Sequence, residues 1–271
     1  IMHYLLSNKY INSVAMTAPT NKATTILQSK FVPHLSKLIK KQEATQMSYY
    51  DILNALDKEN ITIEFMTLHR LLNYKNDFDN DGNKIYVKET KKSKTSIDIT
   101  EYDIIIVDEC SMISRDMAKD LIEEIIILYE KNKFNKEKLP KIIFSGDSAQ
   151  LNPVSEAYAC IFMSQLPNIK KITSRWERLL LDMEFCDMTT VMRNNLDNVV
   201  GICNNIRDWI FNKVTHPEPR KYIGNGVYIY KLGNNDKLKT EWFGEYLNSV
   251  KNITTDMSSN VIVTWTNKQT D

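Results

Sequence analysis

The chain has 271 residues, of which 42% are hydrophobic and 25% are charged, and its net charge is +1. These values are ordinary for a soluble globular protein longer than one typical domain, and the net charge neither favours nor excludes a polyanionic partner. No apolar run approaches the roughly 18 residues of a membrane-spanning helix, and no signal peptide is visible, so we expect a soluble intracellular protein.

The cysteines agree with a reducing compartment. The four residues Cys110, Cys160, Cys186 and Cys203 lie far apart, without a CxxC pair or another metal-site spacing. Reduced thiols are therefore expected.

The amino-terminal segment predicts a helix, a strand and a second helix. Residues 1–10 are typical of the end of a helix, and a short strand follows at 14–18. Pro19 and Thr20 open the next helix, which Pro33 must break or kink. Because the chain begins without Met inside one helix and stops where another begins, we expect it to be a fragment.

A ligand-facing turn is expected after the next strand. Residues 45–57 predict a helix, and the segment from Ile61 alternates like a strand as far as Met66. A short helical turn follows. Thr67 and His69 fall at the strand end, where open α/β sheets meet their ligands.

The polar stretch at about 75–97 predicts a β-hairpin. Asp81 and Gly82 form a turn pair between two β-prone arms. The acidic spacing also imitates a calcium loop, but the twelfth position is Lys88 instead of Glu and no helix frames the segment. We therefore favour an Asp-Gly hairpin inserted between core strands, where such an insertion often contacts something outside the core.

The most informative stretch is a buried strand that ends on two acids. Residues 104–107 are apolar, as in a strand buried on both faces of a parallel sheet, and Asp108 and Glu109 follow directly. A second apolar run downstream stops at Asp147, with Gln150 three residues on. Acids at strand ends are placed to hold a cation and polarise a water, so the two ends predict a nucleotide γ-phosphate site. For the first strand alone, a solvated acidic turn is the alternative.

The remaining segments predict mainly helices. Ser114 is an N-cap candidate for a helix through about residue 131, and another helix is expected near 155–165. Residues 184–190 form a strand-like run, and 196–211 carry an apolar stripe typical of a core-facing helix.

Several strings form an ordered set. APTNKA, TLHRLL, VDECSM, GDSAQLNPV and VMR follow one another, and WTNK lies near the end. The set resembles the motor core of superfamily 1 helicases, in particular the RecD/Dda-like, Pif-type branch. The resemblance implies an α/β fold of two RecA-like parallel sheets flanked by helices, with ATP in the cleft between them and single-stranded DNA across both.

This chain would supply the first RecA-like motor domain as residues 1–195, with a small β-hairpin insertion at about 75–97. Residues 196–271 would be the linker and the beginning of the second domain. Gly is absent from the first 81 residues, so the family's P-loop would precede Ile1. Its two final motifs would follow Asp271. The resemblance thus implies an active ATP hydrolase as the intact protein and an inactive fragment.

The resemblance assigns roles to the acidic strand ends. Asp108 would hold Mg²⁺, and Glu109 would be the base that orients and deprotonates the attacking water. Gln150 matches the family's γ-phosphate sensor, and its amide can donate to a phosphate and accept from a water. Arg193 matches the arginine at the γ-phosphate, for which a surface salt bridge is the alternative. Asp147 more plausibly supports its loop than binds metal.

The resemblance also assigns nucleic-acid contacts to backbone phosphates, without sequence specificity. They are Pro19, Thr20, Asn21, Thr67, His69, Thr266, Asn267 and Lys268.

The leading hypothesis is an ATP-dependent DNA helicase or translocase that binds single-stranded or forked DNA and moves 5′ to 3′. A non-catalytic RecA-like module that binds single strands or acts as a scaffold is one alternative. An unrelated P-loop ATPase is another, disfavoured because TLHRLL and the hairpin would have no purpose. RNA as the track also stays open, because backbone contacts discriminate poorly unless the 2′-hydroxyl is read.

Overall fold

The structure is a computed structural model of the 271-residue chain. It describes residues 2–35, 48–79, 81–82, 84–89, 95–131, 139–165, 172, 174–190, 192, 197–218, 221 and 223–224. Arg193, Thr266, Asn267 and Lys268 lie outside these residues.

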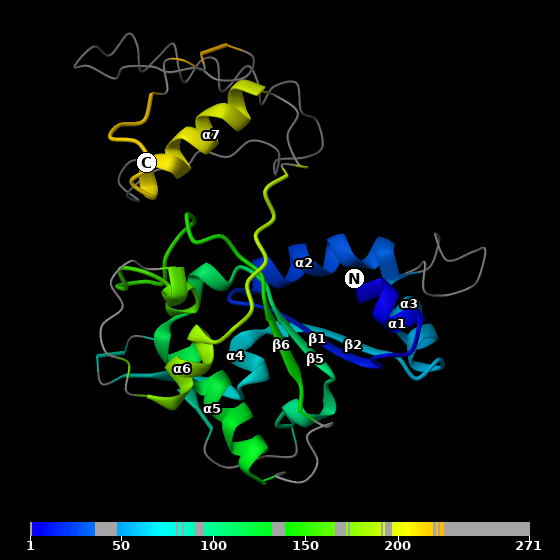
Figure 1. Cartoon of the computed structure of the whole chain (residues 1–271). Coiled ribbons are helices and arrows are strands. Elements are labelled where there is room, and N and C mark those ends of the chain that lie inside the picture. Colours follow the sequence, from blue (N-terminus) through cyan, green and yellow to red (C-terminus); the bar gives the residue numbers. More distant parts are fainter. Residues whose placement is uncertain are drawn as a thin grey trace. The chain divides into compact units, whose positions relative to one another are not determined.

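A four-stranded parallel sheet forms the centre of the first part of the chain (Figure 1). Its order is β2-β1-β5-β6, and its strands are β1 (Ser13–Ala18), β2 (Thr62–Thr67), β5 (Ile104–Val107) and β6 (Lys141–Phe144). The predicted parallel α/β sheet is confirmed.

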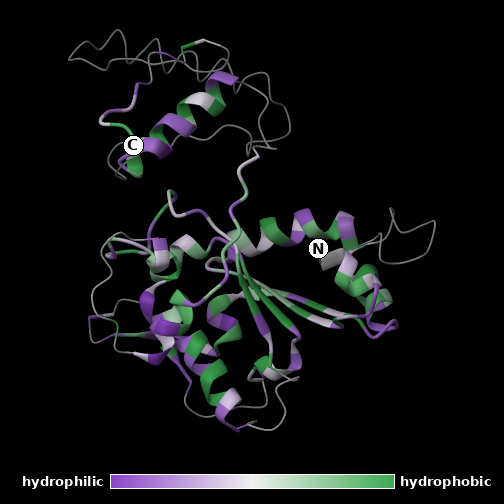
Figure 2. Cartoon of the chain, viewed as in Figure 1, coloured by the Kyte–Doolittle hydropathy of each residue, from purple (hydrophilic) through white to green (hydrophobic). Residues whose placement is uncertain are grey.

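Helices cover both faces of this sheet (Figure 1). Those that contribute to its buried clusters are α1 (Met2–Ser7), α2 (Asn21–Leu35), α3 (Tyr49–Asp57), α4 (Leu68–Leu71), α5 (Arg115–Lys131) and α6 (Arg175–Leu181). Successive side chains of a strand point to opposite faces. Val14 and Met16 of β1 therefore pack with α1, α2 and α3, whereas Ala15 packs with α4, α5 and α6. The strands are mostly green in Figure 2, as this two-sided burial requires.

The predicted hairpin is confirmed. Strands β3 (Tyr74–Phe78) and β4 (Lys84–Lys88) pair antiparallel as a separate two-stranded sheet. Gly82 has a φ of +80° in the connection, a backbone conformation that residues with a Cβ rarely adopt.

Two further local predictions are confirmed. The Oγ of Ser114 accepts a hydrogen bond from the backbone N–H of Met117 at 3.3 Å, so Ser114 caps the start of α5. β2 passes directly into the short helix α4, and Thr67 is the N-cap between them.

Other expectations were wrong. The break expected at Pro33 does not occur, because α2 continues through Pro33 to Leu35. Instead of an α-helix near 155–165, only a 3₁₀ segment forms at Cys160–Gln165. Ser155, with a left-handed φ of 65°, and Phe162, with φ −97° and ψ 15°, depart from α-helical geometry. Residues 184–190 form no strand.

The chain divides into two compact units, residues 1–186 and 187–271. All residues of the two buried clusters belong to the first unit. In the second, helix α7 (Asp197–Ile210) forms as predicted, but it buries none of its residues, so a core role for its apolar stripe is not borne out. Trp209, for example, is 46% exposed.

All four cysteines are free thiols. Among the described residues, no helix is long and apolar enough to cross a membrane.

Candidate nucleotide and nucleic-acid sites

The carboxyl ends of all four parallel strands meet at one edge of the sheet. The register pairs Ala18 with Thr67, Thr17 with Val107, and Val107 with Phe144. The loops that leave these strands carry most of the predicted site residues that the structure describes. In open α/β sheets this edge is where ligands bind.

The acidic pair lies where β5 ends. The backbone N–H of Asp108 still donates to the carbonyl oxygen of Thr17 at 2.8 Å, so the sheet fixes this residue. Glu109 has a left-handed backbone, with φ 52° and ψ 41°. For a residue other than glycine such a backbone costs on the order of 1–3 kcal/mol, and residues of this kind cluster at functional sites. The turn it makes directs the chain into the 3₁₀ segment Cys110–Met112.

Both carboxylates are half-buried, and neither accepts a hydrogen bond from any described residue. Open carboxylate oxygens are suited to a hard cation and to a water molecule. Within the described chain, no three His, Cys, Asp or Glu side chains converge as a metal site. Mg²⁺ commonly needs only one or two carboxylates, since substrate phosphates and waters complete its octahedral shell. The single carboxylate of Asp108 therefore fits a magnesium ion carried by a nucleotide.

The loop after β6 packs directly on the loop after β5. The backbone N–H of Cys110 donates to the carbonyl oxygen of Ser145 at 3.0 Å. A Cβ added to Gly146 would lie 2.7 Å from the Cys110 sulfur and 3.0 Å from its backbone nitrogen. Only glycine permits this approach without a shift, so Gly146 fixes the two loops against each other.

Asp147 shapes the turn that presents Gln150. Its Oδ1 accepts from the backbone N–H of Ala149 at 2.9 Å, and its carbonyl oxygen accepts from the backbone N–H of Gln150 at 3.0 Å. Gln150 is exposed and lines a cavity of about 330 Å³ together with Met112, from the loop after the acidic pair. The loops after β5 and β6 thus share one concave site.

A second, larger cavity lies at the ends of β1 and β2. Its volume is about 530 Å³. Every predicted nucleic-acid contact of the described chain lines it: Pro19, Thr20, Asn21, Thr67 and His69. The structure therefore brings together two motifs separated by almost fifty residues.

Two threonines in this cavity begin helices. Thr20 Oγ1 accepts from the backbone N–H of Ala23 at 3.1 Å at the start of α2, and Thr67 Oγ1 accepts from the backbone N–H of Arg70 at 3.2 Å at the start of α4. α2 has 15 residues, and the free N–H groups of its first turn favour an anion such as a phosphate.

His69 is held between two tyrosine rings. Its ring centroid lies 4.2 Å from that of Tyr86 at a tilt of 34°, and 5.6 Å from that of Tyr74, edge to face. Partial burial lowers the pKa of His69 below its ordinary value, so the imidazole is neutral at pH 7. A contact from His69 to a phosphate would thus be a neutral N–H hydrogen bond, not an ion pair.

Sequence reasoning missed the opposite wall of this cavity. Arg70 and several residues of the hairpin region also line it: Asn73, Tyr74, Lys75, Asn76, Tyr86 and Glu89. The only signal in the sequence was the position of the hairpin, directly after the TLHRLL motif.

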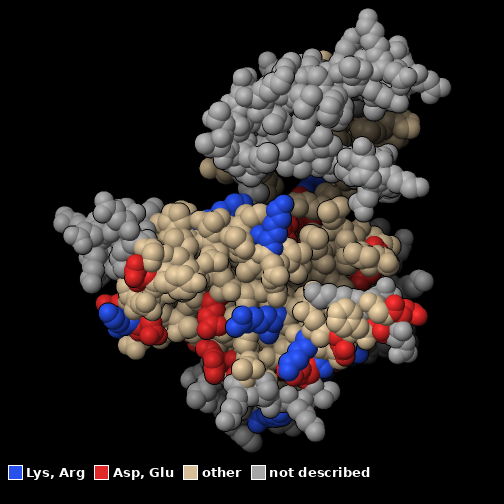
Figure 3. Space-filling model, turned by 180° about the vertical axis from the view of Figure 1, so that it is seen from behind, with Lys and Arg blue, Asp and Glu red and all other residues tan. Residues whose placement is uncertain are grey.

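No single basic patch dominates the face seen from behind in Figure 3. Lys and Arg side chains of the described residues alternate there with Asp and Glu.

The model of one protein family, described as an AAA domain, matches residues 1–156. The chain is 29% identical over 272 residues to a protein of Acanthamoeba polyphaga mimivirus described as "Uncharacterized protein R530". That alignment covers 98% of this chain and 45% of the relative, so the chain spans less than half the relative's length.

Two crystal structures of Bacteroides Pif1 are also similar. One is bound to ssDNA, with 18% identity, a TM-score of 0.33, and coverage of 76% of this chain and 45% of that chain. The other is Pif1 helicase in complex with ADP-AlF3 and ssDNA, with 15% identity, a TM-score of 0.32, and coverage of 94% and 57%. The family match agrees with the resemblance of the ordered motifs, and through residues 1–156 the chain belongs to the AAA domain family.

Proposed function

We propose that the protein to which this chain belongs is an ATP-dependent DNA helicase or translocase. It hydrolyses ATP, moves along single-stranded DNA from 5′ to 3′, and separates duplex DNA at a fork. The observation that carries the proposal is the shared sheet edge: the cavity with five predicted nucleic-acid contacts and the open acidic pair both lie where the parallel strands end.

In this proposal the residues after β5 and β6 perform hydrolysis. Asp108 holds Mg²⁺, which neutralises charge on the phosphates. Glu109 accepts a proton from the attacking water, and its open carboxylate leaves lone pairs for that water. Gln150, on the turn shaped by Asp147, hydrogen-bonds the γ-phosphate and the water.

Arg193 is proposed to stabilise the charge that develops on the γ-phosphate. A guanidinium is always charged and can donate two parallel hydrogen bonds to phosphate oxygens. Thr266, Asn267 and Lys268 are proposed to contact the strand. The domain assignment, 1–195 as a first motor domain and 196–271 as the start of a second, is part of the same proposal.

The residues after β1 and β2 hold the strand. The first turn of α2 donates backbone N–H groups to a phosphate, and Pro19, Thr20 and Asn21 surround this position. Thr67 and His69 supply the next contact, at the start of α4. Because these contacts address the backbone, affinity is expected to vary little with base sequence and to fall linearly with salt on logarithmic axes.

The test is the double variant Thr20→Ala, His69→Ala in the full-length protein. It removes the cap of α2 and the imidazole that lines the cavity, so we expect the affinity for an oligothymidylate to fall about tenfold or more, and DNA-stimulated ATP hydrolysis to fall with it. ATP affinity measured without DNA should stay at the wild-type value, because neither side chain lies at the acidic strand end.

Thr25→Ala is the matched control. Thr25 lies on the same helix, and among the described residues its hydroxyl makes one hydrogen bond, which it donates to the carbonyl oxygen of Asn21 at 3.0 Å. If the double variant binds the oligonucleotide like the wild type throughout a salt titration, the nucleic-acid assignment is wrong. A parallel titration with an RNA strand of the same sequence decides whether DNA or RNA is the preferred track.

A further inference from the structure

The hairpin closes one side of the nucleic-acid cavity, and its attachment to the rest of the first unit is specific. Tyr74, Lys75, Asn76 and Tyr86 line the cavity from the hairpin. A separate two-stranded sheet is only marginally stable by itself. The position of the hairpin side of the cavity therefore depends on the contacts between the hairpin and the rest of the first unit.

The first set of contacts joins the two ends of the insertion, where the chain leaves α4 and returns toward β5. The side chain of Asn73 donates to the carbonyl oxygen of Ile97 at 3.0 Å and accepts from the N–H of Ile97 at 2.7 Å. The backbone N–H of Glu89 donates to the carbonyl oxygen of Asn73 at 3.1 Å. These bonds hold the two ends of the insertion together, but they leave the direction of the hairpin to other contacts.

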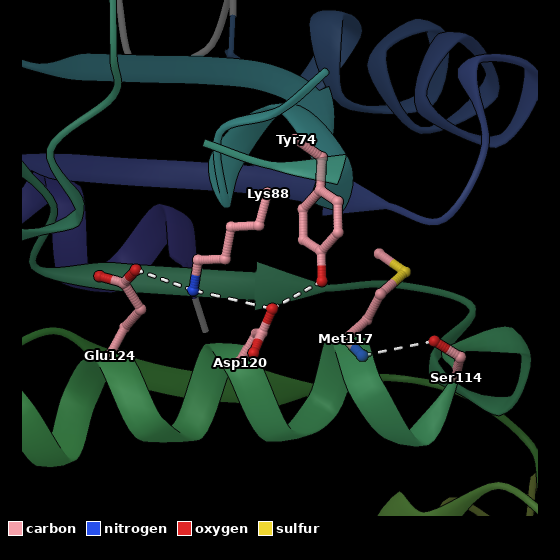
Figure 4. Close-up of polar contacts among 6 residues, drawn as sticks. All are labelled: Tyr74, Lys88, Ser114, Met117, Asp120 and Glu124. Carbon is pink, nitrogen blue, oxygen red and sulfur yellow. Dashed lines mark hydrogen bonds and ion pairs between the residues drawn. The ribbon is translucent and has the colours of Figure 1, made fainter. Parts of the chain in front are cut away.

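The second set of contacts joins the base of the hairpin to α5. Tyr74 and Lys88 are direct partners in the β3–β4 register, and both reach toward the same helix (Figure 4). The hydroxyl of Tyr74 donates to Oδ2 of Asp120 at 2.6 Å. Lys88 Nζ lies 3.0 Å from Oε1 of Glu124 and 3.7 Å from the same Oδ2 of Asp120.

Tyr74 also contacts the cavity directly. Its ring meets that of His69 edge to face at 5.6 Å, while its hydroxyl holds Asp120. Burial, and next the hydrogen bond to Asp120, raise the pKa of Tyr74 above its ordinary value, so the phenol stays a donor into the alkaline range. One side chain thus connects α5 to the predicted strand contact.

Asp120 can hold Tyr74 in place because it lies on a helix that is itself packed against the sheet. The next residue, Leu121, is fully buried, and Met117 one turn earlier is buried too, so α5 is packed firmly against the sheet. A hydrogen bond to a charged acceptor is among the stronger kinds, whereas the partly exposed pairs of Lys88 contribute less.

We propose that Asp120 is a positioning residue for single-strand binding: through Tyr74 and Lys88 it holds the hairpin where the hairpin closes the cavity. Asp120 does not touch the strand. The inference rests on the proposed function of the cavity and adds a determinant of affinity on a different helix. Because α5 begins directly after the loop that carries Asp108 and Glu109, the hairpin is thereby fixed to the element that follows the acidic pair.

The experiment measures binding of a fluorescent oligothymidylate to the full-length protein and its variants. Asp120→Ala removes the acceptor, and we expect about tenfold weaker affinity. Tyr74→Phe keeps the ring against His69 and removes the donor, so it should weaken binding to a similar degree. If the two side chains act through their shared bond, the double variant should be no weaker than Asp120→Ala.

Asp120→Asn is the rescue variant, because an amide oxygen still accepts from the phenol; we expect binding within about twofold of wild type. Glu123→Ala is the matched control: it removes the same charge from the same helix, and its carboxylate makes no hydrogen bond or ion pair with the described residues. In DNA-stimulated hydrolysis, Asp120→Ala should raise the half-saturating DNA concentration about tenfold and leave the maximal rate unchanged.

The results of these measurements distinguish the positioning role of Asp120 from the proposed function of the cavity. If wild type binds the oligonucleotide and folded Asp120→Ala binds equally well, with or without a lower melting temperature, the positioning role is refuted and the proposed function stands. Additive losses in the double variant also refute it. If Asp120→Ala does not fold, the comparison of Tyr74→Phe with Asp120→Asn decides, and equal affinities refute the role. A wild-type protein that binds no single strand overturns both.

Discussion

The two halves of the sheet's carboxyl edge are built in opposite ways. At the ends of β5 and β6, backbone packs on backbone, and the carboxylates of Asp108 and Glu109 are left without hydrogen bonds from described residues. At the ends of β1 and β2, helix caps and stacked rings hold the side chains in place. Groups that take up a cation and a water need open lone pairs, whereas a wall that receives a polymer needs a fixed shape. Substitutions in the two halves should therefore change different measured quantities.

The largest expected effect belongs to the acidic half. Glu109→Gln keeps the size of the side chain and removes the base, so ATP turnover of the full-length protein should fall about 10²- to 10⁴-fold. Binding of ATP and of DNA should remain. Asp108→Asn should in addition weaken magnesium-dependent nucleotide binding, because it removes the charge proposed to hold the ion.

Glu101→Gln is the control for this pair of variants, because Glu101 precedes the same strand at its opposite end and is exposed. Turnover is measured per folded molecule, and ATP affinity with a fluorescent nucleotide. Equal turnover in wild type and Glu109→Gln would remove this carboxylate from the mechanism.

A smaller effect is expected from Gly146→Ala, which tests the backbone contact. The new Cβ would meet the Cys110 sulfur at 2.7 Å and the Cys110 nitrogen at 3.0 Å, so one loop must shift. Overpacking of this kind typically costs about 1–3 kcal/mol, and a melting temperature lower by several degrees is expected. Turnover should fall while DNA affinity stays, since the β1 and β2 ends are not touched.

The background variant Cys110→Ala sharpens this test. It removes the sulfur and leaves the nitrogen contact, so the cost of Gly146→Ala should be smaller in it than in wild type. An unchanged melting temperature for Gly146→Ala alone would show that the two loops are not fixed against each other.

The smallest effect concerns the pH dependence of stability in the binding half. The pKa of His69 is lowered from 6.5 by burial, so the unfolded chain binds a proton more readily than the folded one. Through His69, the free energy of unfolding is therefore at its full value above about pH 6.5 and decreases as the pH falls below that value. His69→Gln should flatten the melting temperature between pH 7 and pH 5.5 relative to wild type. His34→Gln, an exposed histidine on α2, is the control. A wild-type slope that His69→Gln leaves unchanged would contradict this assignment.

The elements and residues that were predictable from the sequence are those whose signal is local. The apolar run before Asp108 and the alternating run before Thr67 identify strands and their ends, and a parallel sheet then brings those ends to one edge. Ser114 was recognisable as a cap because capping depends on the next three residues. These short-range signals located the acidic pair, and the resemblance carried by the ordered motifs identified five of the cavity's lining residues.

The hairpin residues that line the cavity had no such local signal in the sequence. Tyr86 meets His69 only because the hairpin folds back over α4, and the Tyr74–Asp120 bond joins residues 46 positions apart. The strand expected at 184–190 also depended on a distant partner: β-prone residues form a strand only where they pair with a neighbouring strand, and these residues pair with none of the described strands. The helix expected near 155–165 failed too, and Ser155 at its start has a left-handed backbone that no local pattern had indicated.

The position of β1 inside the sheet also governs the order in which the chain is assembled during synthesis. β1 leaves the ribosome before either of its neighbours: its residue Ser13 pairs with Thr62, and Val14 pairs with Ile104. Until β5 has been made, the apolar strand SVAMTA has at most one neighbour, whereas β3 and β4 pair with each other through contacts that are close in sequence. Nascent chains that stop before β5 would thus expose an unpaired inner strand, and they are the species expected to need chaperones.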